Sequence, residues 1–220
     1  MKTIKDVSLE PDYNETAFQR EYRSDFAFRC RFIGNYLRRQ IKQIKFEPIG
    51  YNRIFISACQ FLVKPNNVFE NTLRVSVLFD KDYYDSLNRK GAMDYFIELY
   101  KNGILKASQT HEVPVEFLLN KLKEFKENNY LNEWEFKSKL FKEIGIKATL
   151  FCKMTMEFFS LKLLLRKGGE IVFSEEILKT LPDEIIYHWQ FKEIVLENNE
   201  IKVLDEFKKP IYSLDLTFKV

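Results

Sequence analysis

The residues best suited to bind a charged partner are four cations in the segment 20–45. On a helix that turns by roughly 100° per residue, they fall within about 40° of one another. They are Arg20, Arg31, Arg38 and Lys42. Such a row can neutralise phosphates of a nucleic acid, which gives weak affinity without sequence specificity. The alternative interpretation is a solvated helix face that keeps the protein in solution.

The segment that carries these cations is predicted to be a helix. Its apolar residues recur at steps of three and four, at Tyr22, Phe26, Cys30, Ile33, Leu37, Ile41 and Ile44. Phe28, Cys30 and Phe32 also alternate with arginines, which is the pattern of a half-buried strand. We predict the helix because the helical pattern covers more positions, and strands usually stop at about 4 to 8 residues.

A second cluster combines carboxylates with tyrosines at Asp80, Asp82, Tyr83, Tyr84 and Asp85. Tyrosine supplies a large contact area at low entropic cost, so this composition suits a surface that binds a basic partner. The alternative is structural. In that interpretation the two aspartates Asp80 and Asp82 cap a helix, and one of the tyrosines belongs to the core.

Sequence patterns typical of enzymes and metal sites are absent. The seven glycines form no phosphate-binding loop. His111 and His188 have no second metal ligand at a short spacing. Cys30, Cys59 and Cys152 are far apart and each lies in an apolar run, which indicates buried free thiols in a reducing compartment. We therefore favour a non-enzymatic protein without catalytic, cofactor-binding or metal-binding residues, and a pocket that joined either histidine to carboxylates would reverse this prediction.

The first part of the chain is expected to be rich in helices, around a short antiparallel sheet at about 53–80. The strand from 53 to 63 is apolar on both faces, so it should be central and covered on both sides. The strand from 72 to 80 should pair with it in antiparallel fashion, because the connection is too short for a helical crossover. The other expected elements are a polar lead-in at 1–14 and helices at about 82–103, 114–128 and 132–145.

From residue 146 to the C-terminus, apolar residues alternate and the chain should be strand-rich and antiparallel. Tight hairpins are predicted at Gly168-Gly169 and Asn198-Asn199. A short helix should start at Ser174 and end near Leu181. The predicted strands are 146–158, 161–167, 170–173, 185–194, 194–197, 200–204 and 212–220.

These elements predict an α+β fold, with residues 1–220 in a single domain. The alternative is a subdivision near residue 145, with 15–145 mostly helical around a two- or three-stranded sheet and 146–220 mostly β. Apolar residues make up 45% of the chain and charged residues 30%, which is ordinary for a globular protein and excludes disorder. We expect a cytoplasmic protein that does not associate with membranes, because no signal-like or membrane-spanning apolar stretch is present.

The functional expectation is a non-enzymatic protein that binds another protein. Bacterial immunity proteins, which inhibit toxins, are one such class, and the Lys-rich and Asn-rich composition suits a bacterial or phage genome. Two alternatives are a structural subunit of a phage or other assembly, and nucleic-acid binding by the Arg-rich face. The candidate partner-binding residues are Arg20, Arg31, Arg38, Lys42, Asp82, Tyr83, Tyr84 and Asp85. The sequence leaves the identity of the partner and the oligomeric state open.

Overall fold

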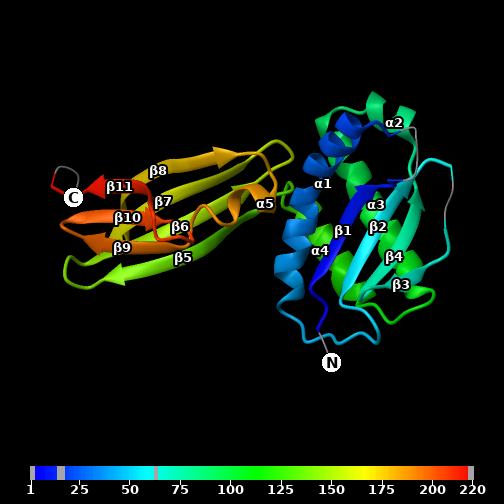
Figure 1. Ribbon diagram of the computed structural model, residues 1–220, viewed down its shortest axis with the longest axis horizontal. Helices are drawn as coiled ribbons and strands as arrows, with labels where there is room; N and C mark the ends of the chain where they lie inside the picture. The colour runs from blue at the N-terminus through cyan, green and yellow to red at the C-terminus, as the bar shows by residue number, and fades with distance from the viewer. Residues whose placement is uncertain (1–2, 14–17, 62–63, 218–220) are drawn as a thin grey trace. The chain divides into compact units, whose positions relative to one another are not determined.

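The computed structural model describes residues 3–13, 18–61 and 64–217 (Figure 1). It divides into two compact units, residues 1–132 and 133–220. The α+β class is confirmed, since the long helices lie in the first unit and the second unit is built mainly of antiparallel strands.

The first unit is a four-stranded sheet with helices packed on its apolar face. Its elements are β1 (Asp6–Pro11), α1 (Arg20–Ile41), β2 (Arg53–Cys59), β3 (Asn67–Phe69), β4 (Thr72–Leu78), α2 (Lys81–Ser86), α3 (Arg89–Ser108) and α4 (Val115–Glu127). The strand order is β1-β2-β4-β3. The predicted helices at about 20–44, 82–103 and 114–128 are confirmed, although the second is divided into α2 and α3.

The antiparallel pairing predicted for the strands at 53–63 and 72–80 is wrong, because β2 and β4 are parallel. The short strand β3 lies on the outer edge of β4 and pairs with it in antiparallel fashion, so the chain returns through a hairpin rather than a helix. Glu70 and Asn71 adopt positive φ angles of 47° and 61° in that hairpin. The central position predicted for β2 is confirmed, whereas residues 62–63 of the predicted strand lie outside the described residues.

The predicted polar lead-in is also wrong, because β1 forms an edge strand parallel to β2. Val7 and Leu9 are buried and alternate with Asp6, Ser8 and Glu10, which are half-buried. The sequence contains this alternation with period two, and the segment forms a strand because it pairs with β2.

Helices α1 and α3 cover the apolar face of the sheet, as Figure 1 shows. The predicted core-facing stripe of α1 is largely confirmed, since Phe26, Cys30 and Leu37 are buried. The Cys30 thiol donates to the carbonyl of Leu9 on β1, at 3.1 Å. All three cysteines are free and buried, as predicted.

The second unit contains two antiparallel sheets, β5-β6-β7-β8 and β9-β10-β11. Its elements are β5 (Glu133–Phe141), β6 (Ile146–Met154), β7 (Phe159–Lys167), β8 (Glu170–Thr180), α5 (Glu184–Tyr187), β9 (Glu193–Glu197), β10 (Glu200–Leu204) and β11 (Pro210–Asp215). Both predicted hairpin turns are confirmed, since Gly168-Gly169 and Asn198-Asn199 all have positive φ angles. The strand predicted at 212–220 begins earlier, at Pro210, and ends at Asp215, while residues 218–220 lie outside the described residues.

The helix predicted at 132–145 is wrong, because this segment forms β5 and pairs with β6. Asn132 followed by Glu135 matches a capping box, the local pattern that favours a helix here. In the structure the Asn132 side chain bonds to α1 instead, and pairing with β6 places Trp134 opposite Cys152. Long-range strand pairing therefore overrides the local helix signal.

Two further predictions in the second unit are wrong. Residues 174–180 continue β8 rather than forming a short helix, because the strand pairs along its whole length with β7. Residues 184–187 form α5 rather than a strand, since the Asp183 carboxylate accepts a hydrogen bond from the Ile185 amide at 3.0 Å and caps the helix. His188 is consequently an exposed residue at the C-terminus of α5.

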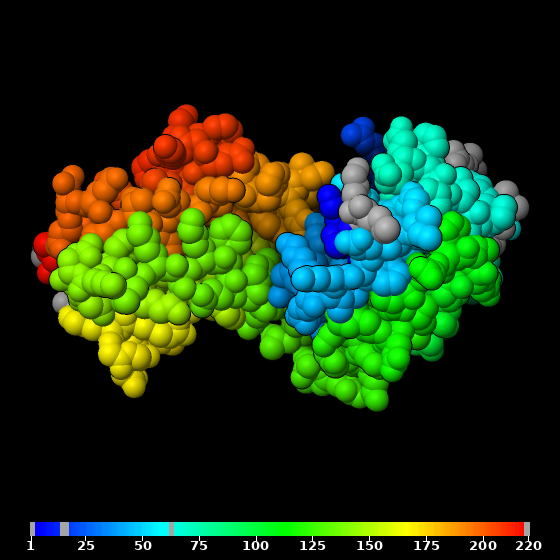
Figure 2. Space-filling view, turned by 90° about the horizontal axis from the view of Figure 1, so that it is seen from below, coloured from blue at the N-terminus to red at the C-terminus, as the bar shows by residue number. Residues whose placement is uncertain are grey.

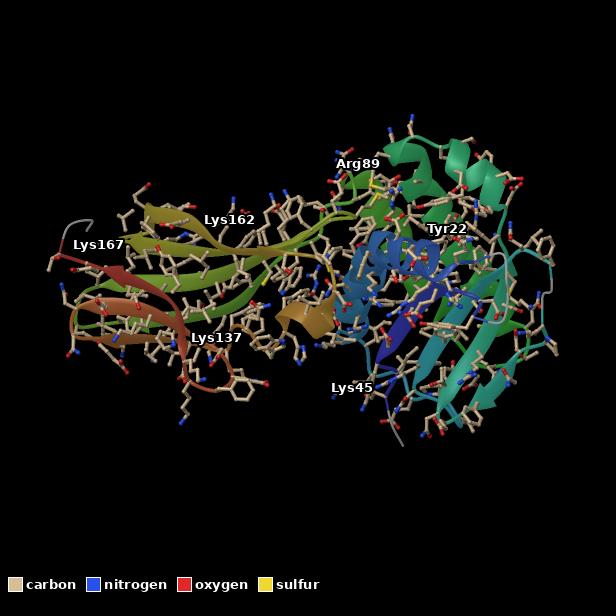
Figure 3. All side chains as sticks on the ribbon, turned by 45° about the horizontal axis from the view of Figure 1, so that its top comes forward. Tyr22, Lys45, Arg89, Lys137, Lys162 and Lys167 are labelled. Carbon is tan, nitrogen blue, oxygen red and sulfur yellow. The ribbon has the colours of Figure 1, made fainter. Side chains whose placement is uncertain are left out.

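Lysine side chains, rather than backbone strand pairing, join β5 to β9 and the residue before it. Lys137 and Lys139 of β5 donate to the carbonyls of Lys192 and Ile194, each at 3.2 Å (Figure 3 labels Lys137). Charged side chains at the borders of sheets discourage pairing with another chain.

Asn132 ends the first unit with a buried hydrogen-bond network. Its amide donates to the carbonyl of Phe32 at 2.9 Å and to the side chain of Asn35 at 3.1 Å, and its oxygen accepts from Arg39. Asn132→Leu should lower the free energy of unfolding by about 1–3 kcal/mol, because buried polar partners lose their hydrogen bonds. Urea denaturation followed by circular dichroism at 222 nm measures this, with the exposed Asn120→Ala as control. Equal stability of the two variants would show that the network contributes nothing.

Candidate functional site

The face of the first unit's sheet opposite α1 and α3 carries a groove of about 540 Å³. We call this surface the open face. Strand residues, and residues of the loops that follow β1 and β2, line the groove. The strand side chains that line it alternate along three parallel strands: Asp6, Ser8 and Glu10 on β1; Arg53, Phe55 and Ser57 on β2; Thr72, Arg74 and Ser76 on β4. The volume lies within the range of ligand pockets, about 300–1,000 Å³.

The carboxylates of β1 bind cations of the protein itself. Asp6 pairs with Arg38 at 2.9 Å, and Glu10 lies 3.9 Å from Arg31. These arginines extend from α1 to the edge strand, so two of the four cations predicted to face a partner contact carboxylates of their own unit. Arg20 and Lys42 are exposed at opposite ends of α1. The structure thus does not bring the four cations together as one unpaired row.

A buried carboxylate lies just beyond the end of β1. Asp12 is 6% exposed, and Lys64 donates to it at 3.0 Å. The Cys59 thiol lies 3.4 Å from the same oxygen. This cluster stands at the carboxyl ends of the parallel strands, where open α/β sheets commonly bind ligands.

Lys106 of α3 supports the wall of the groove from behind. Its ammonium donates to the carbonyl oxygens of Lys64 and Ser76, both at 2.8 Å. Burial lowers the pKa of Lys106. The Ser76 hydroxyl also donates to the Lys64 carbonyl at 2.8 Å, so the backbone at Lys64 is held at two points.

Two arginines of the open face remain exposed. Arg53 lies on β2 and Arg74 on the adjacent strand β4. The Arg74 guanidinium lies over the ring of Phe69, 4.9 Å from its centroid. Stacking of this kind holds a guanidinium in place while leaving its N–H groups available.

The predicted acidic-aromatic cluster is partly structural. The Asp80 carboxylate accepts the amide of Tyr83 at 2.9 Å and caps α2, as the alternative interpretation predicted. Tyr84 is 5% exposed and packs against the rings of Phe26 and Phe96. Burial raises the pKa of Tyr84 to about 12. Tyr84 is therefore a core residue and offers its ring to no partner.

The rest of this cluster lies at the surface. Asp82 and Tyr83 are exposed. Asp85 accepts a hydrogen bond from Tyr22 at 3.2 Å and pairs with Lys81 (Figure 3 labels Tyr22). Burial, together with the neighbouring Asp85 carboxylate, raises the pKa of Tyr22 well above its ordinary value. Of this cluster, Asp82 and Tyr83 thus present exposed side chains, although the Tyr83 ring packs edge-on against Tyr95, with centroids 5.4 Å apart.

Neither histidine lines the groove. His111 accepts or donates a hydrogen bond with Thr110 at 2.8 Å and packs edge-on against Tyr51. The His188 ring bonds the carbonyl of Glu184 in its own helix, at 2.7 Å. Within the described residues, no group of three histidine, cysteine or acidic side chains could hold a metal ion.

The residues that line the open face are not identified by sequence patterns alone. Asp6, Glu10, Arg53 and Arg74 alternate with buried residues, which is a signal of half-buried strands, but the alternation of β1 was assigned to a lead-in. That alternation marks one face of a sheet only once β1, β2 and β4 are known to pair in parallel. In the part of the chain that the structure describes, no helix is long and apolar enough to span a membrane.

Comparison with known proteins identifies no relative: no family model, curated protein sequence or solved structure matches the chain. Function is therefore inferred from the geometry of the open face.

Proposed function

We propose that this protein acts by binding another protein through the open face of the first unit. The observation that carries the proposal is the groove on a face formed by three parallel strands. Sheets of parallel strands almost always have both faces covered. Here α1 and α3 cover one face, and the other presents a groove lined by strand and loop residues.

The composition of β2 supports the same proposal. The sequence predicts a strand that is covered on both sides, and Phe55 is one of the apolar residues on its second face. Phe55 is half-buried at the centre of the groove, between Ser8 of β1 and Arg74 of β4. An aromatic side chain surrounded by polar groups is typical of the centre of a protein interface.

The finer form of the proposal is an inhibitor of the immunity type, made in a bacterial cytoplasm. Three free, buried cysteines support a reducing compartment. The reading frame beside this gene distinguishes inhibitor from assembly subunit: a toxin gene supports inhibition, and a row of virion genes supports assembly.

A photocrosslinker tests the surface directly. Phe55→p-benzoylphenylalanine places the reactive ketone in the groove with a side chain close in shape to the native one. Phe117→p-benzoylphenylalanine is the matched control, because Phe117 is also half-buried but lies on α4. In irradiated cells of the native host, we expect a discrete protein adduct from position 55 and none from position 117.

Three results would contradict the proposal. Identical adducts from both positions would indicate non-specific contact. An adduct that nuclease digestion removes would indicate the alternative function, nucleic-acid binding. The absence of any adduct from position 55, with a correctly folded variant, would show that the open face has no protein partner under those conditions.

A further inference from the structure

The groove carries unpaired positive charge, although its lining contains both signs. The β1 carboxylates Asp6 and Glu10 lie near arginines of α1, and Asp12 is paired with Lys64. Within the described residues, no carboxylate oxygen lies within 4.0 Å of the guanidinium of Arg53 or Arg74. The charge that the groove can offer to a partner is therefore that of these two arginines.

The backbone positions of the two arginines have a defined spacing. Arg53 pairs with Thr72 in the register of β2 and β4, and Phe55 pairs with Arg74. The arginines therefore lie on neighbouring strands, two residues apart along the strand direction. With strands about 4.8 Å apart and a rise of about 3.3 Å per residue, their Cα atoms are about 8 Å apart.

We propose that the groove binds an extended acidic segment of the partner protein, with two carboxylates at alternate positions held by Arg53 and Arg74; this inference rests on the proposed function. Alternate side chains of an extended chain point to the same side and repeat every 7 Å or so, which approximates the spacing of the arginines. Arginine binds carboxylates through two parallel hydrogen bonds. The hydroxyls of Ser57 and Thr72 line the same groove and can bond to the partner's backbone.

A polypeptide fits this surface better than a nucleic acid does. Nucleic-acid affinity depends on the number of phosphates neutralised, and two unpaired cations give little. The third basic residue of the groove, Lys64, is paired with Asp12, so a continuous row of phosphates would meet only the two arginines. Two spaced carboxylates on a peptide match that number of cations.

Amide NMR spectra of the full chain test the inference with a defined probe, the blocked peptide Thr-Glu-Thr-Glu-Thr. We expect it to shift the amide signals of β2 and β4 around Arg53 and Arg74. The glutamine analogue of the peptide should bind at least about tenfold more weakly, because it loses both charge-assisted pairs with the arginines. The variant Arg53→Gln/Arg74→Gln should lose affinity for the glutamate peptide by the same factor.

A charge-matched variant serves as control. Lys45→Gln/Lys90→Gln removes two exposed cations of the same unit that do not line the groove, and its affinity should change by less than about twofold, since distant surface charges are screened. Equal binding of the glutamate and glutamine peptides would overturn the inference. A tighter response to single-stranded oligothymidylate at the same amides would also overturn it.

The crosslinker separates this inference from the proposed function. We expect the adduct from position 55 to disappear when Arg53 and Arg74 are replaced by glutamine. An undiminished adduct in the variant that lacks both arginines would still support a protein partner, but it would overturn the inference that this partner binds through an acidic segment. If Phe55→p-benzoylphenylalanine gives no adduct even with Arg53 and Arg74 in place, the proposed function itself is contradicted.

Discussion

Phe159→Ala is expected to lower the free energy of unfolding of the second unit by about 3–5 kcal/mol, the usual cost of deleting a buried phenylalanine ring. Phe159 is fully buried and stacks on Tyr187, with ring centroids 3.6 Å apart and an interplanar angle of 6°. Phe191 lies nearly parallel to it at 5.7 Å. Removal of the central ring leaves a cavity between its neighbours.

Tryptophan fluorescence during urea denaturation measures this effect, because Trp134 and Trp189 both lie in the second unit, and Trp134 is 6.2 Å from the Phe159 ring. Phe158→Ala is the matched control, since the adjacent phenylalanine is only half-buried and lies 4.5 Å from the ammonium of Lys179. Equal losses from the two variants would contradict the inward placement of Phe159.

Gly103→Ala should lower the free energy of unfolding of the first unit by about 2–3 kcal/mol, although alanine favours a helix by about 1 kcal/mol over glycine. Helix α3 approaches β2 so closely that a Cβ at this position would meet three atoms of Ile56 at 2.5, 2.6 and 2.8 Å. Ile56 is fully buried in the central strand and has no room to move away.

Circular dichroism at 222 nm follows this transition, because α1 to α4 all lie in the first unit. Asn102→Ala is the control, since Asn102 is exposed and precedes Gly103 in the same helix. The double variant Gly103→Ala/Ile56→Ala should lose less free energy of unfolding than the sum of the losses of the two single variants, because the smaller side chain at position 56 makes room for the new methyl group. A stability gain from Gly103→Ala alone would show that the helix and strand can separate without cost.

The contact that Gly103 makes lies inside the first unit, beneath the surface that Figure 2 shows in blue to green, where α3 packs against β2 and β4. From the sequence, Gly103 is expected to end a helix, where a glycine often adopts a left-handed conformation. In the structure α3 continues to Ser108, and Gly103 is buried within it. The residue is explained by close packing, which no local pattern reports.

Local periodicity was enough to predict α1, α4 and the two tight hairpins of the second unit. These elements are decided by residues that lie within a few turns or a few positions of each other, so their signals are contained in short stretches of sequence. The stripe of apolar residues on α1 and the paired glycines at 168 and 169 are examples. The fold class followed from the same signals.

The tertiary structure alone decided the direction of β4, the strand conformation of β5 and the existence of the open face. Each depends on pairing between segments that are distant in sequence: β3 returns the chain to make β4 parallel, and β6 makes a strand of a segment with helix-like capping residues. The groove arises only when β1, β2 and β4 stand side by side with their polar residues on one face. Strand register and direction are properties of the assembled sheet, so a single chain segment does not encode them.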